Sequence, residues 1–285
     1  MIIINTIKEL RRHIKKLHLA PVGLVPTMGT LHKGHLSLVI NALNECPLIV
    51  VSIYVNPAQF NDEEDLKNYP RTLEKDLALL KKYLRENDMV FTPDDKEMYP
   101  TEDNRIFNFG NLDSVMEALH RPGHFNGVAK AVTRLFDIVR PQIAYFGMKD
   151  FQQLAVIREI VRQKKYKIRI SGNPIIREPD GLAMSSRNLL LDKKHRQKAP
   201  VIYRTISSAS AMLGELDIPE IKEYVRKEIE KTGDLRVEYF EIVDDKKLVP
   251  VNTKDRMKKN KRYFGCVAVR AGKIRLIDNI EFQLV

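Results

Sequence analysis

Short apolar runs alternate with longer stretches of helical periodicity over the first half of the chain. Six apolar runs predict β-strands, at residues 2–4, 22–26, 48–55, 88–92, 142–146 and 167–171. Apolar side chains three or four positions apart predict four helices between them, at residues 36–43, 73–85, 127–139 and 151–164. The run at 48–55 is apolar nearly throughout, which is typical of a parallel strand covered on both faces.

This alternation predicts an α/β domain with a doubly wound, Rossmann-like parallel sheet and right-handed crossovers over residues 1–174. The pattern changes after Pro174. Residues 182–285 predict a smaller C-terminal α+β domain, with helices and then strands at about 193–214, 219–231, 236–243, 263–270 and 273–278. The Pro- and Gly-containing segment 175–181 is expected to form a hinge.

Composition limits the class of protein. A chain of 285 residues, 44% hydrophobic and 30% charged, is long enough for two compact domains and is not typical of disorder. No apolar run approaches the roughly 20 residues that span a bilayer, and no basic flank precedes the apolar start, so we expect neither a membrane segment nor a secretory signal. Cys46 and Cys266 form neither a metal-binding spacing nor a disulfide framework. We therefore expect a cytoplasmic protein.

The net charge of +11 is concentrated in one stretch. Residues 246–275 hold eleven Lys or Arg and a single acid, Asp255. A solvated face is the commonest explanation of such a stretch and ranks first. A nucleic-acid site ranks lower, because no aromatic-rich stacking motif surrounds the basic residues.

The first cluster of candidate functional residues lies at residues 26–35, between a predicted strand and a predicted helix. His32 and His35 are three residues apart, so both can face one ligand from the first helical turn. Gly29 and Gly34 allow close backbone approach, and the helix start offers free N–H groups to phosphate. A lone His would be an ordinary structural residue, and a zinc site lacks a third ligand nearby. The pair favours phosphate binding through imidazole N–H groups.

The second cluster, Ser185, Ser186 and Arg187, follows the predicted hinge. Two hydroxyls and a guanidinium can hold a triphosphate through charge-assisted hydrogen bonds. By itself this tripeptide would be an ordinary helix start. Its co-occurrence with the first cluster is what favours a role in binding.

These residues lie in recognisable motifs. His32-Lys33-Gly34-His35 resembles the HxGH signature of the nucleotidylyltransferase superfamily, and residues 184–187 resemble its counterpart of the synthetase KMSKS loop. Six ordered strings resemble the pantothenate synthetase (pantoate–β-alanine ligase) family: PTMGTLHKGHLSLV, VSIYVNPAQF, NYPRTLEKDL, RPGHFNGVAKAV, YFGMKDFQQLAVIRE and REPDGLAMSSRN. The resemblance covers essentially the full chain and is densest between residues 26 and 188.

The resemblance implies an ATP-dependent ligase that joins pantoate to β-alanine through a pantoyl-adenylate and releases AMP and pyrophosphate. It implies ATP as a substrate, Mg²⁺, and a homodimer supported by the strand at 50–55 and the turn after it, with no nucleic-acid or membrane partner. Adenylation makes physical sense, because a carboxylate is a poor acyl donor until it carries a good leaving group. The mixed anhydride then needs shelter from water.

The resemblance also implies roles for individual residues. His35, as proton donor, His32 and Lys149 would be catalytic. The implied ATP site comprises Met28, Gly29, Thr30, Leu31, His32, Lys33, Gly34, His35, Gly147, Met148, Lys149, Asp150, Ile176, Met184, Ser185, Ser186 and Arg187. Gln59 and Gln153 would bind pantoate, with Gln59 also contacting β-alanine, since a neutral amide can bond both hydroxyl and carboxylate groups.

Other candidates carry less weight. Asn56 is a weaker substrate contact, and for Arg121 and His124 a substrate contact and a surface loop weigh equally. Some family members have two adjacent acids where this chain has Lys75-Asp76, so we expect Asp76 to reach Mg²⁺ through water at most.

Three other functions compete with the ligase. A nucleotidylyltransferase would leave AMP on its product, and an aminoacyl activator would use the same two motifs. The matching glutamines and the lack of a tRNA-binding module weigh against both. A nucleic-acid-binding protein using residues 246–275 would show salt-sensitive affinity for RNA and no turnover.

Overall fold

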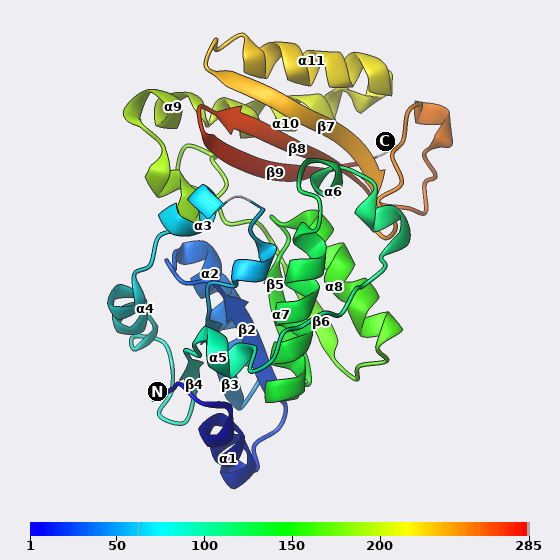
Figure 1. Ribbon diagram of the computed structural model, residues 1–285. Helices are drawn as coiled ribbons and strands as arrows, with labels where there is room; N and C mark the ends of the chain where they lie inside the picture. The colour runs from blue at the N-terminus through cyan, green and yellow to red at the C-terminus, as the bar shows by residue number, and fades with distance from the viewer. Residues whose placement is uncertain (62, 284–285) are drawn as a thin grey trace.

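The computed structural model describes residues 1–61 and 63–283 and contains two sheets (Figure 1). The larger sheet is parallel, with strands in the order β1-β4-β3-β2-β5-β6. These strands are β1 (Ile2–Ile4), β2 (Val22–Thr27), β3 (Leu48–Ile53), β4 (Met89–Phe91), β5 (Ile143–Gly147) and β6 (Arg169–Asn173). The predicted doubly wound sheet is confirmed.

Helices cover both faces of this sheet. One face carries α2 (Lys33–Glu45) and α4 (Leu73–Leu80), and the other carries α1 (Ile7–Leu17), α7 (His124–Val139) and α8 (Phe151–Gln163). Strand β3 contributes alternate residues to the two cores: Leu48 and Val50 to one, Ile49 and Val51 to the other. All four side chains are fully buried, which is why this strand is apolar without a period of two.

Short helical segments connect these elements. They are η1 (Pro57–Gln59), α3 (Glu63–Asn68), α5 (Asp95–Met98), η2 (Gly110–Asp113) and α6 (Glu117–His120). Helix α1 was not among the predicted elements, although its apolar residues Ile7, Leu10, Ile14 and Leu17 lie on one helical face and pack against the core on that side of the sheet.

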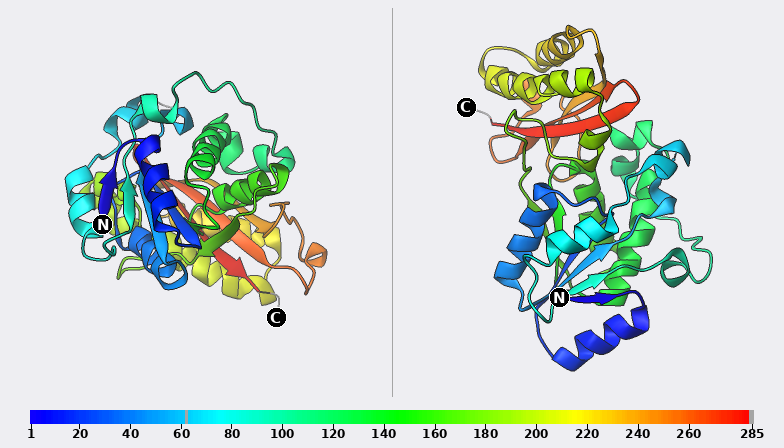
Figure 2. Two further views of the ribbon diagram at one scale, coloured as in Figure 1. Left: turned by 90° about the horizontal axis from the view of Figure 1, so that it is seen from below. Right: turned by 90° about the vertical axis from the view of Figure 1, so that its left-hand side faces the viewer.

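The C-terminal region (residues 182–285) builds the smaller sheet. Strands β7 (Leu235–Asp244), β8 (Tyr263–Ala271) and β9 (Ile274–Phe282) pair antiparallel in that order. Helices α10 (Val201–Ala211) and α11 (Ile218–Glu230) pack on one face around their own apolar core (Figures 1 and 2). The segment expected to be helical at 193–214 is divided into α9 (Lys193–Lys198), α10 and the short turn η4 (Met212–Gly214). The turn η3 (Ser186–Leu190) precedes it. Pro200, which has no N–H to donate, separates α9 from α10.

The two regions meet at an apolar contact beside α8. The rings of Phe151 and Phe264 lie 4.4 Å apart between centroids, and Val243 and Cys266 are buried in the same cluster. Strand β9 is an edge strand of the small sheet and faces the larger sheet region (Figure 1). None of the helices in the described residues is long and apolar enough to span a membrane.

Candidate active site

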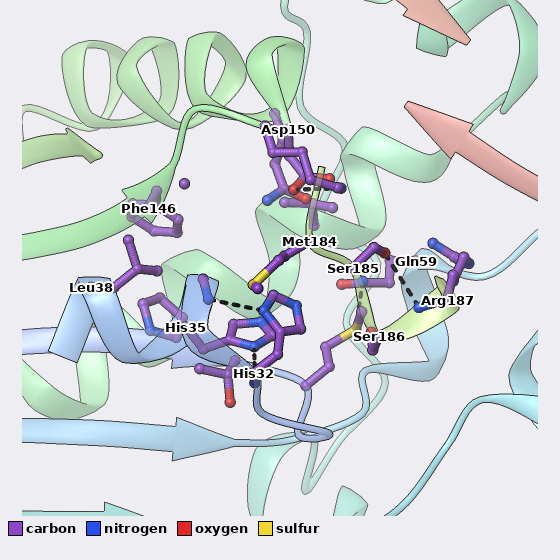
Figure 3. Close-up of a pocket in the computed structure, with 18 of the residues that line it drawn as sticks. His32, His35, Leu38, Gln59, Phe146, Asp150, Met184, Ser185, Ser186 and Arg187 are labelled. Atoms are coloured by element: carbon purple, nitrogen blue, oxygen red, sulfur yellow. Dashed lines mark hydrogen bonds and ion pairs between the residues drawn. The ribbon is translucent and has the colours of Figure 1, made fainter. Parts of the chain in front are cut away.

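A pocket opens where the order of the large sheet reverses. From β2 the chain winds outward through β3 and β4, whereas β5 leads to β6 on the other side. Loops beyond the carboxyl ends of such neighbouring strands diverge and leave a crevice. The start of α2, which follows β2, supplies His32 and His35 to this pocket, and the turn after β5 supplies Lys149 and Asp150. Figure 3 shows His32, His35 and Asp150 around it.

The two histidines are held by the backbone at the start of α2. His32 is the N-cap, and its Nδ1 accepts the backbone N–H of Gly34 at 3.1 Å. The backbone N–H of His32 in turn donates to Nδ1 of His35 at 3.3 Å. Since both Nδ1 atoms accept hydrogen bonds, the proton of each neutral ring lies on Nε2. Each ring can therefore offer an Nε2–H to a ligand.

Close packing keeps the imidazoles together. Their ring centroids lie 4.0 Å apart (Figure 3). A Cβ atom on Gly34 would lie only 2.8 Å from Cε1 of His32, so any side chain at this position would displace the ring. The position of the His32 ring therefore requires a glycine at residue 34.

Both imidazoles are neutral at physiological pH. Burial in the pocket, followed by the charge of Lys149, lowers the pKa of His32 from 6.5 to about 4. Burial, His32 and Lys149 lower the pKa of His35 to about 3. The positive charge beside this pair is therefore carried by Lys149 rather than by the rings.

Asp76 holds the loop that precedes the histidines. Its Oδ2 accepts the backbone N–H of Thr30 at 2.8 Å, and its Oδ1 accepts that of Leu31 at 2.7 Å. Thr30 has a φ of 51°, a left-handed conformation that is unfavourable for a β-branched residue. The two backbone hydrogen bonds that Asp76 accepts stabilise that conformation, together with the hydrogen bond from Thr30 Oγ1 to the Pro70 carbonyl at 2.8 Å.

This arrangement does not fit Asp76 as a metal site. Its side chain is buried, both oxygens accept backbone hydrogen bonds, and it is not among the described residues that line the pocket. Within residues 1–61 and 63–283, no group of three or more His, Cys, Asp or Glu could hold a metal ion. The prediction that Asp76 reaches Mg²⁺ through water thus finds no support in this geometry.

An amide corner forms another wall. Nε2 of Gln59 lies 2.8 Å from the Met28 sulfur, and Nδ2 of Asn56 donates to Oε1 of Gln59 at 3.2 Å. Helix α7 packs directly on this turn, since a Cβ on Gly127 would lie 2.0 Å from the Ala58 carbonyl oxygen. Gln153 reaches the same pocket from α8. The two predicted pantoate glutamines therefore share one cavity.

The remaining wall comes from the connection between the two regions. The backbone N–H of Met184 donates to the Ile176 carbonyl at 2.9 Å, so the chain doubles back and presents residues 184–187 to the pocket. Oγ of Ser186 lies 3.2 Å from the Tyr69 hydroxyl, and Nη2 of Arg187 donates to Asp65 at 2.8 Å. Arg187 is thus engaged by a carboxylate on α3.

Most of the predicted site residues meet here. Those that line the pocket are Met28, His32, Gly34, His35, Gln59, Gly147, Lys149, Asp150, Gln153, Ile176, Met184, Ser185, Ser186 and Arg187. Among the described residues, six that were predicted lie outside its lining: Gly29, Thr30, Leu31, Lys33, Asp76 and Met148. Arg121 and His124 line a smaller adjoining cavity, where Nδ1 of His124 donates to the Gln59 carbonyl at 2.8 Å.

Sequence reasoning missed part of the lining. Tyr69 lies within the NYPRT string, which was the available signal. The apolar wall from α7 consists of Val128, Ala131, Val132 and Leu135. Its spacing is the same as that of helix residues facing a core, so no sequence pattern distinguishes the two.

The fold and the pocket define an α/β nucleotide-binding enzyme with an HxGH-type loop. The sequence profile of the family described as "Pantoate-beta-alanine ligase" matches residues 2–281, and the chain belongs to this family. It is 47% identical over 285 residues to the pantothenate synthetase of Bacteroides thetaiotaomicron, covering 99% of each chain. It is 45% identical over 286 residues to that of Porphyromonas gingivalis, covering 99% of this chain and 100% of the relative.

Solved structures agree. The crystal structure of pantothenate synthetase from Thermus thermophilus matches with a TM-score of 0.90 and 41% identity over 100% of both chains. The pantoate-beta-alanine ligase of Francisella tularensis, described as complexed with beta-gamma ATP and beta-alanine, matches with a TM-score of 0.80 and 33% identity, covering 98% and 97%. The chain is accordingly a ligase that makes pantothenate from pantoate, β-alanine and ATP.

Proposed function

We propose that the ligase reaction runs in this pocket through a pantoyl-adenylate. A pantoate carboxylate oxygen attacks the α-phosphorus of ATP, and the bond to the β-phosphate oxygen breaks as pyrophosphate leaves. The β-alanine amine then attacks the activated carbonyl, loses a proton, and AMP departs. The observation that carries this proposal is the convergence of two Nε2–H donors, Lys149 and two amide side chains on one cavity.

Phosphate is bound by donors that need no rearrangement. His32 and His35 donate as neutral imidazoles, aided by the N-terminus of α2. Lys149 adds the positive charge that stabilises the pentacoordinate phosphorus as its charge grows. Ser185, Ser186 and Arg187 take the outer phosphates. In this account His35 shares its proton through a hydrogen bond, because its lowered pKa leaves little imidazolium at neutral pH.

Pantoate occupies the wall between Gln59 and Gln153. The amides bond its hydroxyl and carboxylate oxygens, and the apolar residues of α7, such as Val132, pack against its dimethyl carbon. β-Alanine enters next to Gln59 after adenylation. Since Asp76 does not fit as a ligand of Mg²⁺, we assign Mg²⁺ neither a protein ligand nor a step.

Two domains, residues 1–174 and 182–285, frame the pocket, and we assign residues 175–181 as the hinge between them. Closure about this hinge draws Ser185, Ser186 and Arg187 onto the phosphates and excludes water from the adenylate. Crystal structures with and without nucleotide test this. Identical interdomain angles in both would contradict it.

We also infer a homodimer in the cytoplasm, where ATP is available. The strand expected to support the dimer contact, β3, is an interior strand with Val50 and Val51 fully buried. It can therefore only brace a contact made by other residues. Light scattering measures the subunit number directly.

Isotope transfer tests the intermediate. With pantoate labelled by ¹⁸O in both carboxylate oxygens, attack on the α-phosphorus puts one labelled oxygen into AMP and leaves one in the amide of pantothenate. Attack on the γ- or β-phosphorus would instead label inorganic phosphate or pyrophosphate. Mass spectrometry of the products distinguishes these outcomes, and unlabelled AMP would overturn the adenylate proposal.

A further inference from the structure

The turn that carries Lys149 is held by a residue from the far end of the chain. Nδ2 of Asn279, on β9, donates to the carbonyl of Met148 at 2.9 Å and to that of Lys149 at 3.1 Å. Its side chain is only 4% exposed, so water does not compete well for these carbonyls. Two consecutive peptide planes are thus oriented by one amide group of the C-terminal region.

Among the described residues, the other restraints on this turn are few, and Nζ of Lys149 itself lies 3.4 Å from Oδ2 of Asp150. The backbone N–H of Met148 donates to the Asn173 carbonyl at 2.8 Å, which fixes where the turn begins. Asp150 sits at the N-cap of α8, yet within the described part of the chain its side chain makes no capping hydrogen bond to the helix. Without Asn279, the carbonyls of Met148 and Lys149 lose the side-chain donor that orients their two peptide planes, so the backbone that carries Lys149 is less well fixed.

The neighbouring residue anchors the opposite wall of the pocket. The carboxylate of Asp278 accepts hydrogen bonds from Nη1 and Nη2 of Arg177, at 2.6 and 3.0 Å, and Asp278 is 4% exposed. Arg177 lies in the connection that leads to residues 184–187, and its guanidinium lies 3.6 Å from the centroid of the Tyr203 ring. Two adjacent residues of β9 therefore hold both the connection and the Lys149 turn.

We propose that Asn279 is a positioning residue for adenylation, which directs the Lys149 ammonium at the α-phosphate. This inference rests on the role proposed above for Lys149. Asn279 thereby couples the position of the C-terminal region to that of Lys149, the cation next to the imidazole pair. Asn279 itself does not contact the substrates.

A double-mutant cycle tests this role. Pyrophosphate release in a single turnover with ATP and pantoate is measured for Asn279→Ala, Lys149→Ala and the combination. We expect about a tenfold loss for Asn279→Ala, the scale of two buried hydrogen bonds, and a larger loss for Lys149→Ala. In the Lys149→Ala background, Asn279→Ala should cost less than about twofold, because the group it positions is gone.

Each other outcome decides against the proposal. Equal losses from Asn279→Ala in both backgrounds would show a general structural role and leave the role of Lys149 standing. Near-normal release by Lys149→Ala would overturn the role of Lys149 and the inference with it. Unchanged release by Asn279→Ala would overturn the inference alone.

Two further variants separate positioning from folding. Asn279→Asp preserves the shape of the side chain but removes both donors, so it should lose at least as much activity as Asn279→Ala. If Asn279→Ala does not fold, Asn279→Asp enters the same cycle. Asn252→Ala, an exposed asparagine of the same region, is the matched control and should behave as the unmodified chain.

Discussion

Two segments face the pocket, and they are built differently. The segment at residues 27–35 is held by hydrogen bonds within a few residues and by Asp76 of the same sheet region. The segment at residues 184–187 is held by the connection between regions, by Tyr69 and by Asp65, more than 100 residues away in sequence. The first is preformed, whereas the second depends on how the two regions sit together.

The two segments also differ in charge. The imidazoles are neutral because burial and Lys149 lower their pKa values, so in the proposed reaction they act on phosphate as dipoles rather than as cations. Arg187 is a permanent cation, but it already has a carboxylate partner at 2.8 Å. The preformed segment thus offers free donors at once, while the second must exchange one anionic partner for another.

The largest expected effect comes from removing a donor of the preformed segment. We expect His35→Ala to lower kcat by about 100-fold or more, the scale of losing one donor to a developing oxyanion. The loss should appear in pyrophosphate release, with the far-ultraviolet circular dichroism unchanged. His13→Ala, a histidine of α1, is the control. Near-normal turnover of a folded His35→Ala protein would remove this residue from the mechanism.

A smaller effect should follow from loosening the same segment without removing its donors. Asp76→Asn turns an amide N–H₂ towards one of the backbone N–H groups of Thr30 and Leu31, leaving a buried donor unsatisfied. We expect a loss of about 1–3 kcal/mol in the free energy of unfolding and about tenfold in kcat/KM for ATP. Urea unfolding and initial rates measure the two, with Asp255→Asn as an exposed control. Unchanged values in both would refute the bracing role of Asp76.

Neutrality of the imidazoles predicts a dependence of stability on pH. The pKa values of His32, His35 and His124 lie at about 4, 3 and 4 in the folded protein, below the ordinary 6.5. The unfolded chain therefore takes up protons first, and the free energy of unfolding should fall as pH drops from about 7 towards 4. Each group contributes up to about 1.4 kcal/mol per pH unit.

Urea unfolding at pH 7.5 and 5.5 measures this change. His124→Asn should reduce the difference between the two pH values, because one buried group no longer takes part. His13→Ala should leave the difference as it is. A stability that is flat over this range would contradict the neutral state of the pair.

The smallest effect concerns the second segment. Asp65→Asn removes the carboxylate that competes with triphosphate for Arg187, so the KM for ATP should fall, by less than about fivefold for a partly exposed ion pair. Glu63→Gln on the same helix is the matched control for charge. A higher KM for ATP in Asp65→Asn would mean that Asp65 orients Arg187 rather than competing for it.

Local order was predictable where both faces of an element are buried or where a motif is short. Strand β3 was predictable because a strand buried on both faces is a continuous apolar run. The pairing of His32 and His35 was predictable because residues three apart lie on the same turn of a helix. Helix α1 was missed although its four apolar residues share one face, and the two helices that Pro200 separates were merged into one. The bracing of the loop by Asp76 was not predicted, because its partners lie 45 and 46 residues away.

By itself, the sequence determined the parallel α/β order, the family, and most of the residues that line the pocket, because apolar periods and contiguous motifs record contacts between near neighbours. Only the tertiary structure decided that Asp76 braces a loop, that Arg187 meets Asp65, and that Asn279 holds the Lys149 turn. A hydrogen bond between residues 130 positions apart leaves no periodic trace in a chain. Its geometry exists only once the small sheet has packed against α8 and the turn before it.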